Sequence, residues 1–346
     1  MANTSFSDRV IFAVVQCLAV LCHPRITQSF WKRRGRIPNF ARPGELGETV
    51  QWRKVFDHNP LFTTLCDKLA AKRWVAERFP DMPLVQPVWV GTRPEDVPEA
   101  FTVPGYIIKA NHGCRANYFP HREPLPRPQL NKLMARWLRR SYYLQGQWGY
   151  RDIDRRLLVE PCIGGGGSLT EYCFRCHDGV VVACYIVRDQ HQDTESGCDF
   201  AGDGTRLPPM HGKDPARNLP PDYVLSDSYF YARDTASRIS RGLDHVRVDF
   251  LVDGDSIYLG EITIYPGSGY GDERYSQIDG PIELAWFRAM HLSWFYRTPK
   301  PWPMSIYQDA FRRWVDAHVL DLNATAPVDE RSYVAPDTSP RRIPQV

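Results

Sequence analysis

The feature that most constrains this chain is a pair of apolar segments joined by a short acidic turn. Residues 245–252 (HVRVDFLV) and 256–265 (SIYLGEITIY) alternate between apolar and polar side chains over much of their length, and Asp253-Gly254-Asp255 separates them. Alternation with a period of two is typical of strands, and a turn of this kind between two such segments predicts a β-hairpin. The chain must therefore build antiparallel sheet.

A second hairpin and several helices complete the predicted elements. Asp178-Gly179 separates two further alternating segments, which again predicts a hairpin. Short apolar runs between turn residues predict strands over residues 84–90, 106–110, 157–159, 171–176 and 180–187. Helical periodicity marks residues 49–79, as two helices joined at His58-Asn59-Pro60, and then residues 129–143 and 281–296. The pattern mixes α and β.

Two segments lack periodicity. Residues 190–225 are polar and rich in Gly, Pro and Asp, which indicates a long functional loop or lid. Its charged and titratable side chains are His191, Asp193, Arg206, His211 and Lys213. From about Asn323 the chain is polar and proline-rich, which predicts a flexible tail.

Composition excludes some partners and favours one compartment. Lys+Arg 43 against Asp+Glu 40 gives a net charge of +3, too small to predict nucleic-acid binding without a local basic patch. Nine cysteines, an odd number, indicate free thiols in a reducing compartment, so we expect a cytoplasmic protein. Cys173-Phe174-Arg175-Cys176-His177 matches the pattern of covalent haem attachment and half of a zinc site, but no second Cys/His pair stands at a regular spacing. We interpret that match as coincidence.

The apolar segment Val10–Cys22 is shorter than a spanning helix and lacks the basic start and small-residue cleavage site of a signal peptide. We interpret it as a packed helix. A second interpretation stays open, because Trp31-Lys32-Arg33-Arg34-Gly35-Arg36 follows as a basic and aromatic flank. Residues 10–36 would then make a peripheral contact with an anionic membrane at its inner face.

The first hairpin places carboxylates in apolar surroundings. A three-residue turn at Asp253–Asp255 would pair Asp249 with Leu259 and Arg247 with Glu261, so that these charged side chains and Thr263 share one face. A two-residue turn would reverse the parity and separate Glu261 from Asp249. Two interpretations stay open: a cross-strand salt bridge between Arg247 and Glu261, or a divalent-metal site suited to Mg²⁺ that carries nucleotide phosphates.

Two more strands deliver charged groups. In YIIKANHG, residues 106–113, an apolar strand ends in Lys109 and then breaks at Asn111, a way to direct an ammonium group at a phosphate. In LLVEP, residues 157–161, a strand ends in Glu160 and Pro161, which leaves a carboxylate and a free carbonyl of the kind that reads adenine.

Taken together and in this order, these pieces resemble the ATP-grasp superfamily, specifically the TupA-like ATP-grasp proteins of bacterial surface-polysaccharide biosynthesis. The segments that carry the resemblance are DHNPLFTTLCDKLAAKRWV at 57–75, YIIKANHG at 106–113, WLRRSYYLQGQWGYRDI at 137–153 with LLVEP after it, HVRVDF at 245–250 and GEITIYPGSG at 260–269. The resemblance covers roughly residues 37–290.

The resemblance implies an α+β fold in which two lobes with antiparallel sheets sandwich a nucleotide, preceded by a helical region. It divides the chain into a helical N-terminal region with a partial pre-ATP-grasp subdomain, a small lobe, a large lobe with the metal site, and a C-terminal helix with the flexible tail. The ranges are 1–97, 98–163, 164–298 and 299–346.

The resemblance also implies residue roles. Lys109 and Lys68 would contact the ATP phosphates, Asn111 would bind the cofactor, and Glu160 and Pro161 would read adenine and ribose. Arg247 would neutralise the transferred phosphoryl group, with Lys109 as the second catalytic residue. Mg²⁺ would be held by Asp249, Glu261 and Thr263, where Thr263 stands in place of a frequent asparagine. The loop Cys114-Arg115-Ala116-Asn117 departs from the usual Ser-Gly-x-Asn and loses a glycine.

The implied activity is an ATP- and Mg²⁺-dependent ligase that joins a carboxylate to an amine through an acyl phosphate, with small-molecule or glycan substrates. Two alternatives stay open: a non-catalytic nucleotide-binding or scaffold protein of a polysaccharide assembly system, and an ATP-dependent phosphotransferase on the same fold. The sequence leaves the oligomeric state and the identity of both substrates open.

Overall fold

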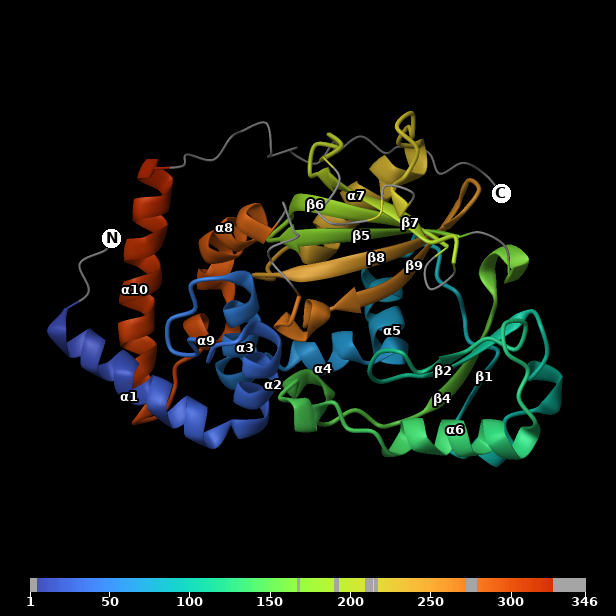
Figure 1. The fold of residues 1–346 in the computed structure, drawn as a ribbon, viewed down its shortest axis with the longest axis horizontal. Helices are drawn as coiled ribbons and strands as arrows, with labels where there is room; N and C mark the ends of the chain where they lie inside the picture. Colours follow the sequence, from blue (N-terminus) through green and yellow to red (C-terminus); the bar gives the residue numbers. More distant parts are fainter. Residues whose placement is uncertain are drawn as a thin grey trace.

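The structure is a computed structural model that describes residues 5–166, 169–189, 193–208, 214, 217–271 and 279–325 (Figure 1). Its helices are α1 Phe6–Cys22, α2 Pro24–Arg34, α3 Leu46–Phe56, α4 Leu61–Cys66, α5 Lys68–Arg78, α6 Arg127–Arg139, α7 Asp227–Ser240, α8 Asp279–Ala289, α9 Trp294–Arg297 and α10 Met304–Thr325. Its strands are β1 Trp89–Gly91, β2 Tyr106–Ala110, β3 Asn117–Tyr118, β4 Leu157–Pro161, β5 Thr170–His177, β6 Val180–Arg188, β7 Ser196–Ala201, β8 Val246–Asp253 and β9 Ser256–Thr263.

The large sheet has five antiparallel strands in the order β7-β6-β5-β8-β9. One face is apolar and includes Phe174, Val248 and Phe250, which pack with Tyr229 of α7 in the main core. The other face is polar, because Arg175 on β5 lies opposite Arg247 on β8 and every second residue shares that side. In Figure 1, α7 lies above this sheet and α4 and α5 lie below it.

The small sheet has four antiparallel strands in the order β1-β4-β2-β3. Ile108 and Val159 turn one face toward Leu130 and Met134 of α6, which form a separate core. The alternate residues of β2 and β4 therefore face away from α6. Lys109 is one of them. Together the two sheets and their helices confirm the predicted α+β class.

Both hairpins are confirmed, with one correction to the register. Asp178 and Gly179 both have positive φ, as a two-residue turn between His177 and Val180 requires. The second turn has two residues rather than the predicted three, since Asp253 pairs with Ser256. A β-bulge at Gly260 then shifts the register by one residue, so that Asp249 pairs with Glu261 and Arg247 with Thr263. The predicted pairs, Asp249 with Leu259 and Arg247 with Glu261, are therefore wrong, although the predicted shared face is kept.

Other predicted boundaries also change. The predicted helices over 49–79 are three, because Asp67 leaves the helical path to bridge His112. The strand predicted over 84–90 forms only at Trp89–Gly91, since Pro83 and Pro87 lack the N–H groups that a ladder needs. The helix predicted over 281–296 begins at Asp279 and breaks after Ala289, and that over 129–143 ends at Arg139.

The predicted lid over residues 190–225 is wrong in part. Residues 196–201 form β7, an edge strand hydrogen-bonded to β6. Arg206 folds the following segment back, because its guanidinium donates to the carbonyls of Leu219 and Pro220. His191, His211 and Lys213 lie outside the described residues, as does the tail from residue 326.

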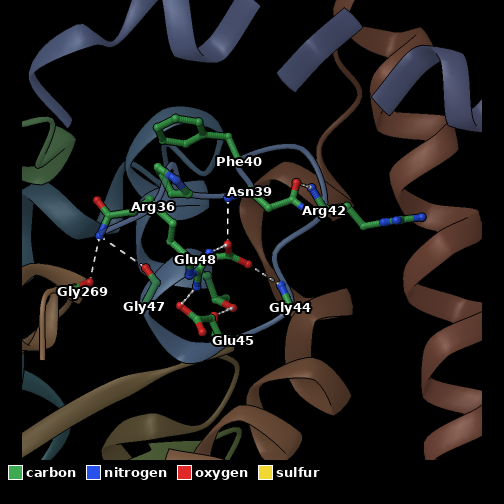
Figure 2. A network of polar contacts seen from close by, with 12 residues as sticks. Arg36, Asn39, Phe40, Arg42, Gly44, Glu45, Gly47, Glu48 and Gly269 are labelled. Carbon is green, nitrogen blue, oxygen red and sulfur yellow. Dashed lines mark hydrogen bonds and ion pairs between the residues drawn. The ribbon is translucent and has the colours of Figure 1, made fainter. Parts of the chain in front are cut away.

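The N-terminal region packs on the C-terminal helix. Asp8 of α1 pairs with Arg313 of α10 at 2.6 Å, and Trp52 of α3 stacks on Phe311 with ring centroids 4.8 Å apart. Glu48 fixes the intervening segment, since its carboxylate accepts from the backbone N–H of Asn39 and of Gly44 (Figure 2). Among the described residues no single helix is long and apolar enough to span a membrane. Helices α1 and α2, which are bent by 95° where they join, meet the length and composition criteria for a span only when they are taken together.

Candidate active site

The polar face of the large sheet carries a cluster of two carboxylates and two cations. Asp249 on β8 lies opposite Glu261 on β9, and Arg247 lies opposite Thr263. Arg247 Nε donates to both oxygens of Asp249 at 2.7 and 2.9 Å, and its Nη2 donates to Thr263 Oγ1 at 3.1 Å. The four residues therefore share one face, as predicted, although the ion pair runs along β8 rather than across to Glu261.

Lys68 completes this cluster from α5. Its ammonium lies 3.3 Å from Glu261 Oε1 and donates to the carbonyl of Gly113, 3.2 Å away, in the turn after β2. The backbone N–H of Lys68 also donates to the carbonyl of Asn111 at 2.8 Å. One residue thus ties the large sheet to the small lobe.

The small lobe presents a second cluster around Glu160. The Glu160 carboxylate accepts from Lys109 at 2.8 Å and also from Lys72 of α5. Both lysines are only partly exposed, and Glu160 is buried. Burial would raise the pKa of Glu160, but the two ammonium groups outweigh it and lower that pKa. The carboxylate is held ionised.

The charges of the two clusters act on one another. Burial would raise the pKa of Glu261, but Lys68, Arg247 and Lys109 lower it. Burial and the charge of Asp249 raise the pKa of Glu171, on β5, to about 7, while Arg247 and Lys109 oppose that rise. Lys109 thus lies near enough to Glu261 and Glu171 for its charge to act on both. Lys68, which contacts both Glu261 and the carbonyl of Gly113, links the two clusters.

Asn111 is held by contacts within the protein. It is fully buried, and its amide nitrogen donates to Asp67 Oδ1 at 3.0 Å and to the carbonyl of Asp154 at 2.9 Å. Its amide oxygen accepts from the backbone N–H of Arg156 at 2.8 Å. These contacts fix the turn after β2 against α5. A contact between Asn111 and the cofactor stays a prediction, as does the role of Pro161, whose backbone pairs with Tyr106 at an exposed position.

The turn after β2 combines a glycine with a strained arginine. Gly113 has φ +78°, and a Cβ at that position would lie 1.9 Å from the ring of Tyr142, so only glycine fits. Arg115 has φ +57°, a left-handed conformation that a side chain disfavours. It stands where the family pattern has glycine. The backbone shape of the loop is thus kept at a cost in strain.

The donor set suits a magnesium ion that is bound together with phosphates. Asp249, Glu261 and Thr263 offer hard oxygen ligands on one face, the type that Mg²⁺ prefers. Within the described ranges no group of three or more His, Cys, Asp or Glu side chains is placed to hold a metal, Cys173 and Cys176-His177 included. Mg²⁺ commonly takes one or two carboxylates and completes its shell with water and substrate phosphates, so two carboxylates and a hydroxyl fit.

The sequence interpretation missed three residues of this cleft. Lys72 comes from a helix one turn after Lys68, and that i to i+4 spacing was the available signal. Glu171 and Arg175 alternate with apolar residues along β5, so the same period that predicted the strand placed both on one face. The alternation alone does not predict which strand pairs with β5.

The two sheets and helix α5 bring cations together around three carboxylates, an arrangement that suits the class of proteins that bind a polyanion between two lobes. Comparison with known families agrees with this class. Residues 48–282, more than half of the chain, match the family described as TupA-like ATPgrasp. The chain belongs to the TupA-like ATP-grasp family.

Solved structures show more distant likenesses. The ATP-grasp ligase PsnB complexed with a minimal precursor is 12% identical with a TM-score of 0.38, and the aligned part covers 68% of this chain and 63% of that one. This chain thus spans less than two thirds of PsnB. The D-alanine-D-alanine ligase from Bacillus anthracis complexed with ATP is 14% identical, with a TM-score of 0.37 and coverage of 84% and 77%. The corresponding ligase from Helicobacter pylori is 14% identical, with a TM-score of 0.36 and coverage of 70% and 69%. No match was found among curated proteins.

Proposed function

We propose that the protein is an ATP- and Mg²⁺-dependent ligase that joins a carboxylate to an amine through an acyl phosphate. The observation that carries the proposal is the arrangement of Lys68, Lys72, Lys109 and Arg247 around Glu160, Asp249 and Glu261. Among the residues of these ion pairs, four cations outnumber three carboxylates, so the site favours a polyanion. Phosphoryl transfer depends mainly on positioning and positive charge.

The proposed roles follow the two clusters. Lys109 and Lys68 bind the phosphates of ATP, and the backbone at Glu160 and Pro161 reads adenine and ribose. Asp249, Glu261 and Thr263 hold Mg²⁺, which would neutralise charge on the phosphates and align them. Arg247, adjacent to Asp249, stabilises the phosphoryl group during transfer. Residues 1–97 are the helical region, 98–163 the small lobe, 164–298 the large lobe and 299–346 the C-terminal part, with β1 hydrogen-bonded into the small sheet.

The chemistry proceeds in two steps. An oxygen of the acid attacks the γ-phosphorus, the bond to the β-phosphate oxygen breaks, and ADP leaves. The amine then attacks the acyl carbon, the bond to the phosphate oxygen breaks, and phosphate leaves while the amine loses a proton. Both steps need the negative charge of the phosphates to be balanced at Lys109, Lys68 and Arg247.

The test is turnover of Mg-ATP with pooled carboxylic acids and pooled amines, read as ADP and phosphate release together with new amide mass. Asp249→Asn should reduce turnover by about a hundredfold or more, because the phosphates lose their clamp. Asp255→Asn is the matched control, since Asp255 is an exposed aspartate in the turn of the same hairpin. Equal turnover in wild type and Asp249→Asn would contradict the metal assignment.

The same assay separates the alternatives. A phosphotransferase would form ADP with a hydroxyl acceptor and need no amine. A non-catalytic nucleotide-binding protein would bind Mg-ATP without any turnover, an outcome that the strain at Arg115 and the engagement of Asp249 by Arg247 make worth testing. Either outcome would replace the ligase proposal.

We place this activity in surface-polysaccharide or related metabolite biosynthesis in the cytoplasm, at the inner face of the membrane, with no nucleic-acid partner. Support for membrane contact comes from α1. Its side chains Phe6, Val10, Val14, Leu18 and Leu21 recur every three or four residues and are between 47% and 76% exposed. An apolar helix face of this length needs a cover.

The basic residues beside this apolar face favour an anionic membrane as the surface that covers it. Exposed basic residues Lys32 and Arg33 lie near the end of α2, next to the exposed Trp31. A groove of about 940 Å³ runs between α1 and residues 36–42, with Arg9, Arg36 and Arg42 among its lining residues. An apolar face flanked by basic side chains is typical of helices that lie in the interface of anionic bilayers.

Co-sedimentation with vesicles tests this contact. Wild type should bind vesicles of phosphatidylcholine mixed with phosphatidylglycerol, and Leu18→Glu should reduce that binding by about tenfold or more, because a charge enters the apolar face. Val224→Glu is the control, since Val224 is 82% exposed and lies before α7. Binding that persists in Leu18→Glu, or its absence in wild type, would overturn the membrane contact and leave the ligase proposal untouched.

A further inference from the structure

Helix α6 carries a cluster of basic side chains on the outside of the small lobe. Its inner face, which includes Leu130 and Met134, is buried against the small sheet. Arg136 and Arg139 on the helix and Arg140 directly after it are exposed. Residues three and four positions apart are neighbours on a helix surface, so these three arginines gather on one side. They are called the α6 basic cluster below.

The charge of this cluster is not neutralised within the described part of the protein. Residues 124–151 contain six lysines or arginines and no aspartate or glutamate. None of the ion pairs between described residues includes a member of the cluster, whereas Arg151 nearby pairs with Asp152. The small lobe, residues 98–163, has 11 Lys or Arg against 5 Asp or Glu, a net charge of +6. Because the whole chain has only +3, the rest of it sums to −3 and the positive charge is local to this lobe.

Neither the phosphate site nor the stability of the helix explains the cluster. Ile108 and Val159 of the small sheet face α6, whereas Lys109 and Glu160 face the opposite way, so the sheet separates the cluster from the phosphate site. The helix dipole favours basic side chains in a last turn, but three of them so close together also repel one another. An anionic partner would offset that repulsion.

Exposed apolar side chains follow the cluster along the chain. Tyr143 is 43% exposed and Leu144 is 56% exposed, both in the 3₁₀ turn Tyr143–Gln145. The next residue packs on α2, because a Cβ at Gly146 would lie 2.4 Å from Ile26 Cδ1. An aromatic ring and a leucine beside arginines are typical of segments that lie in the interface of anionic bilayers.

The cluster lies on the same edge of the molecule as one end of α1. In Figure 1, α6 and the C-terminal end of α1 both lie along the lower edge. Leu18 and Leu21, near that end of α1, are 55% and 75% exposed, and Arg25 at the start of α2 is exposed. A flat partner that covers the end of α1 therefore also reaches α6.

We propose that the α6 basic cluster, together with Tyr143 and Leu144, is a second membrane contact that lays the small lobe on the anionic bilayer. The proposal deepens the membrane contact proposed for α1, on which it rests for the choice of partner, and it is independent of the ligase reaction. A bilayer fits better than a nucleic acid, because its interface accommodates tyrosine and leucine beside cations, whereas nucleic-acid phosphates attract only the cations. Two contacts on one molecule also reinforce each other, since the second forms within an existing complex.

Co-sedimentation of the full chain with vesicles of phosphatidylcholine and phosphatidylglycerol tests the second contact. Neutralising two arginines of the cluster, Arg136→Gln with Arg139→Gln, should lower the partition coefficient by about tenfold or more at low salt. The matched control is Arg238→Gln with Arg241→Gln, two exposed arginines with the same spacing at the end of α7, which lies on the opposite side of the large sheet from α4 and α5. This control should bind as wild type does.

Two further measurements separate membrane attraction from other roles of the cluster. Arg136→Lys with Arg139→Lys should bind nearly as tightly as wild type, because a lipid surface responds to charge rather than to the shape of a guanidinium group. Hydrogen exchange at residues 141–146 should slow when vesicles are added, since Tyr143 and Leu144 enter the interface. Melting temperatures of each variant exclude loss of fold as the cause.

Several results would overturn the proposal. Wild-type binding by the neutralised pair would leave α1 as the membrane contact without α6, and equal loss in the lysine pair would show recognition of a specific ligand instead of a charged surface. Random-sequence duplex DNA that binds through the same two arginines, more tightly than the vesicles do, would make nucleic acid the partner. No binding of vesicles by wild type would remove both membrane contacts. Turnover of Mg-ATP is measured without vesicles, so the ligase proposal stands or fails separately.

Discussion

Two buried arginines of this structure lie close to His245 and differ in their ion pairs. Arg53 of α3 is fully buried, pairs with Asp244 at 2.7 Å, and donates to the carbonyls of His245 and Ile264, each at 3.0 Å. Its guanidinium also lies 4.4 Å from the ring centroid of Trp286. Arg175, which lines a small cavity together with His245, makes no ion pair with a described residue. Both guanidinium groups include buried nitrogens without a hydrogen-bond partner, Nε and Nη2 of Arg53 and Nη1 of Arg175.

The difference distinguishes an arginine that stabilises the fold from one that is available to a ligand. A buried cation that is neutralised and hydrogen-bonded holds the fold together, and removing it strands its partners. A buried cation that makes no ion pair beside a cavity destabilises the fold unless a bound ligand supplies an anion. The Arg53 cluster joins α3 to α8 and to the segment before β8, whereas Arg175 lines a small cavity. Each prediction below tests whether that division holds.

The largest effect is expected at Arg53. Arg53→Met should reduce the free energy of unfolding by about 3 to 5 kcal/mol, because Asp244 loses its ion pair and two carbonyls lose a donor in a dry interior, while Trp286 Nε1 still donates to Asp244. Urea denaturation gives the value. Arg139→Met, an exposed substitution, should change it by less than about 0.5 kcal/mol. A loss below about 1 kcal/mol at Arg53 would remove the contrast between the two arginines.

The second prediction concerns Glu171, a carboxyl on the same polar face. Its pKa is raised to about 7 by burial and by Asp249, so the folded protein binds a proton between pH 4.5 and about 7 that the unfolded chain releases. Stability from this group is complete below pH 4.5 and is lost as pH rises through 7. Glu171→Gln should lack that decline, so its stability relative to wild type should rise by on the order of 2 kcal/mol from pH 4.5 to pH 8. Urea denaturation at both pH values measures the difference, and parallel pH profiles would show that Glu171 is ionised throughout.

Much of this architecture follows from the sequence, and the failures have physical causes. Period-two alternation and an Asp-Gly turn predicted β5, β6 and their hairpin, because those signals are local. The register of Glu261 depended on a bulge at Gly260, where a Cβ would lie 3.2 Å from the carbonyl oxygen of Asp249. A bulge depends on the partner strand and cannot be predicted from one strand alone. The turn length was predicted wrongly, and the bulge restored the shared face that the longer turn would have given.

The candidate site was also predictable only in part. Lys109, Glu160, Asp249 and Glu261 were identifiable as charged residues in apolar strands. Their partners were not, because Lys72 and Lys68 reach them from a helix far away in the chain. Arg175 lies between Cys173 and Cys176, whose spacing resembles a metal-binding motif. The alternation along β5 places Arg175 on the polar face of the sheet, opposite Arg247.

The smallest effect is expected at Arg115, an exposed cation whose strain has a local origin. Its φ of +57° costs about 1 kcal/mol for a side chain, while glycine adds a comparable entropy to the unfolded chain. Arg115→Gly should therefore change stability by less than about 1 kcal/mol. The loop should also move more easily, which hydrogen exchange at residues 113–116 would detect. A large loss of stability would mean that Arg115 makes a contact essential to the fold.

The central claim is that the cleft between Lys109 and Asp249 binds Mg-ATP, and calorimetric titration of Mg-AMPPNP tests it directly. Lys109→Ala removes a charge-assisted contact worth about 1.5 to 3 kcal/mol, so the Kd should rise roughly 10- to 100-fold. Lys132→Ala, an exposed lysine on α6, should leave the Kd unchanged. The same Kd for Lys109→Ala and wild type, with both variants folded, would contradict the claim.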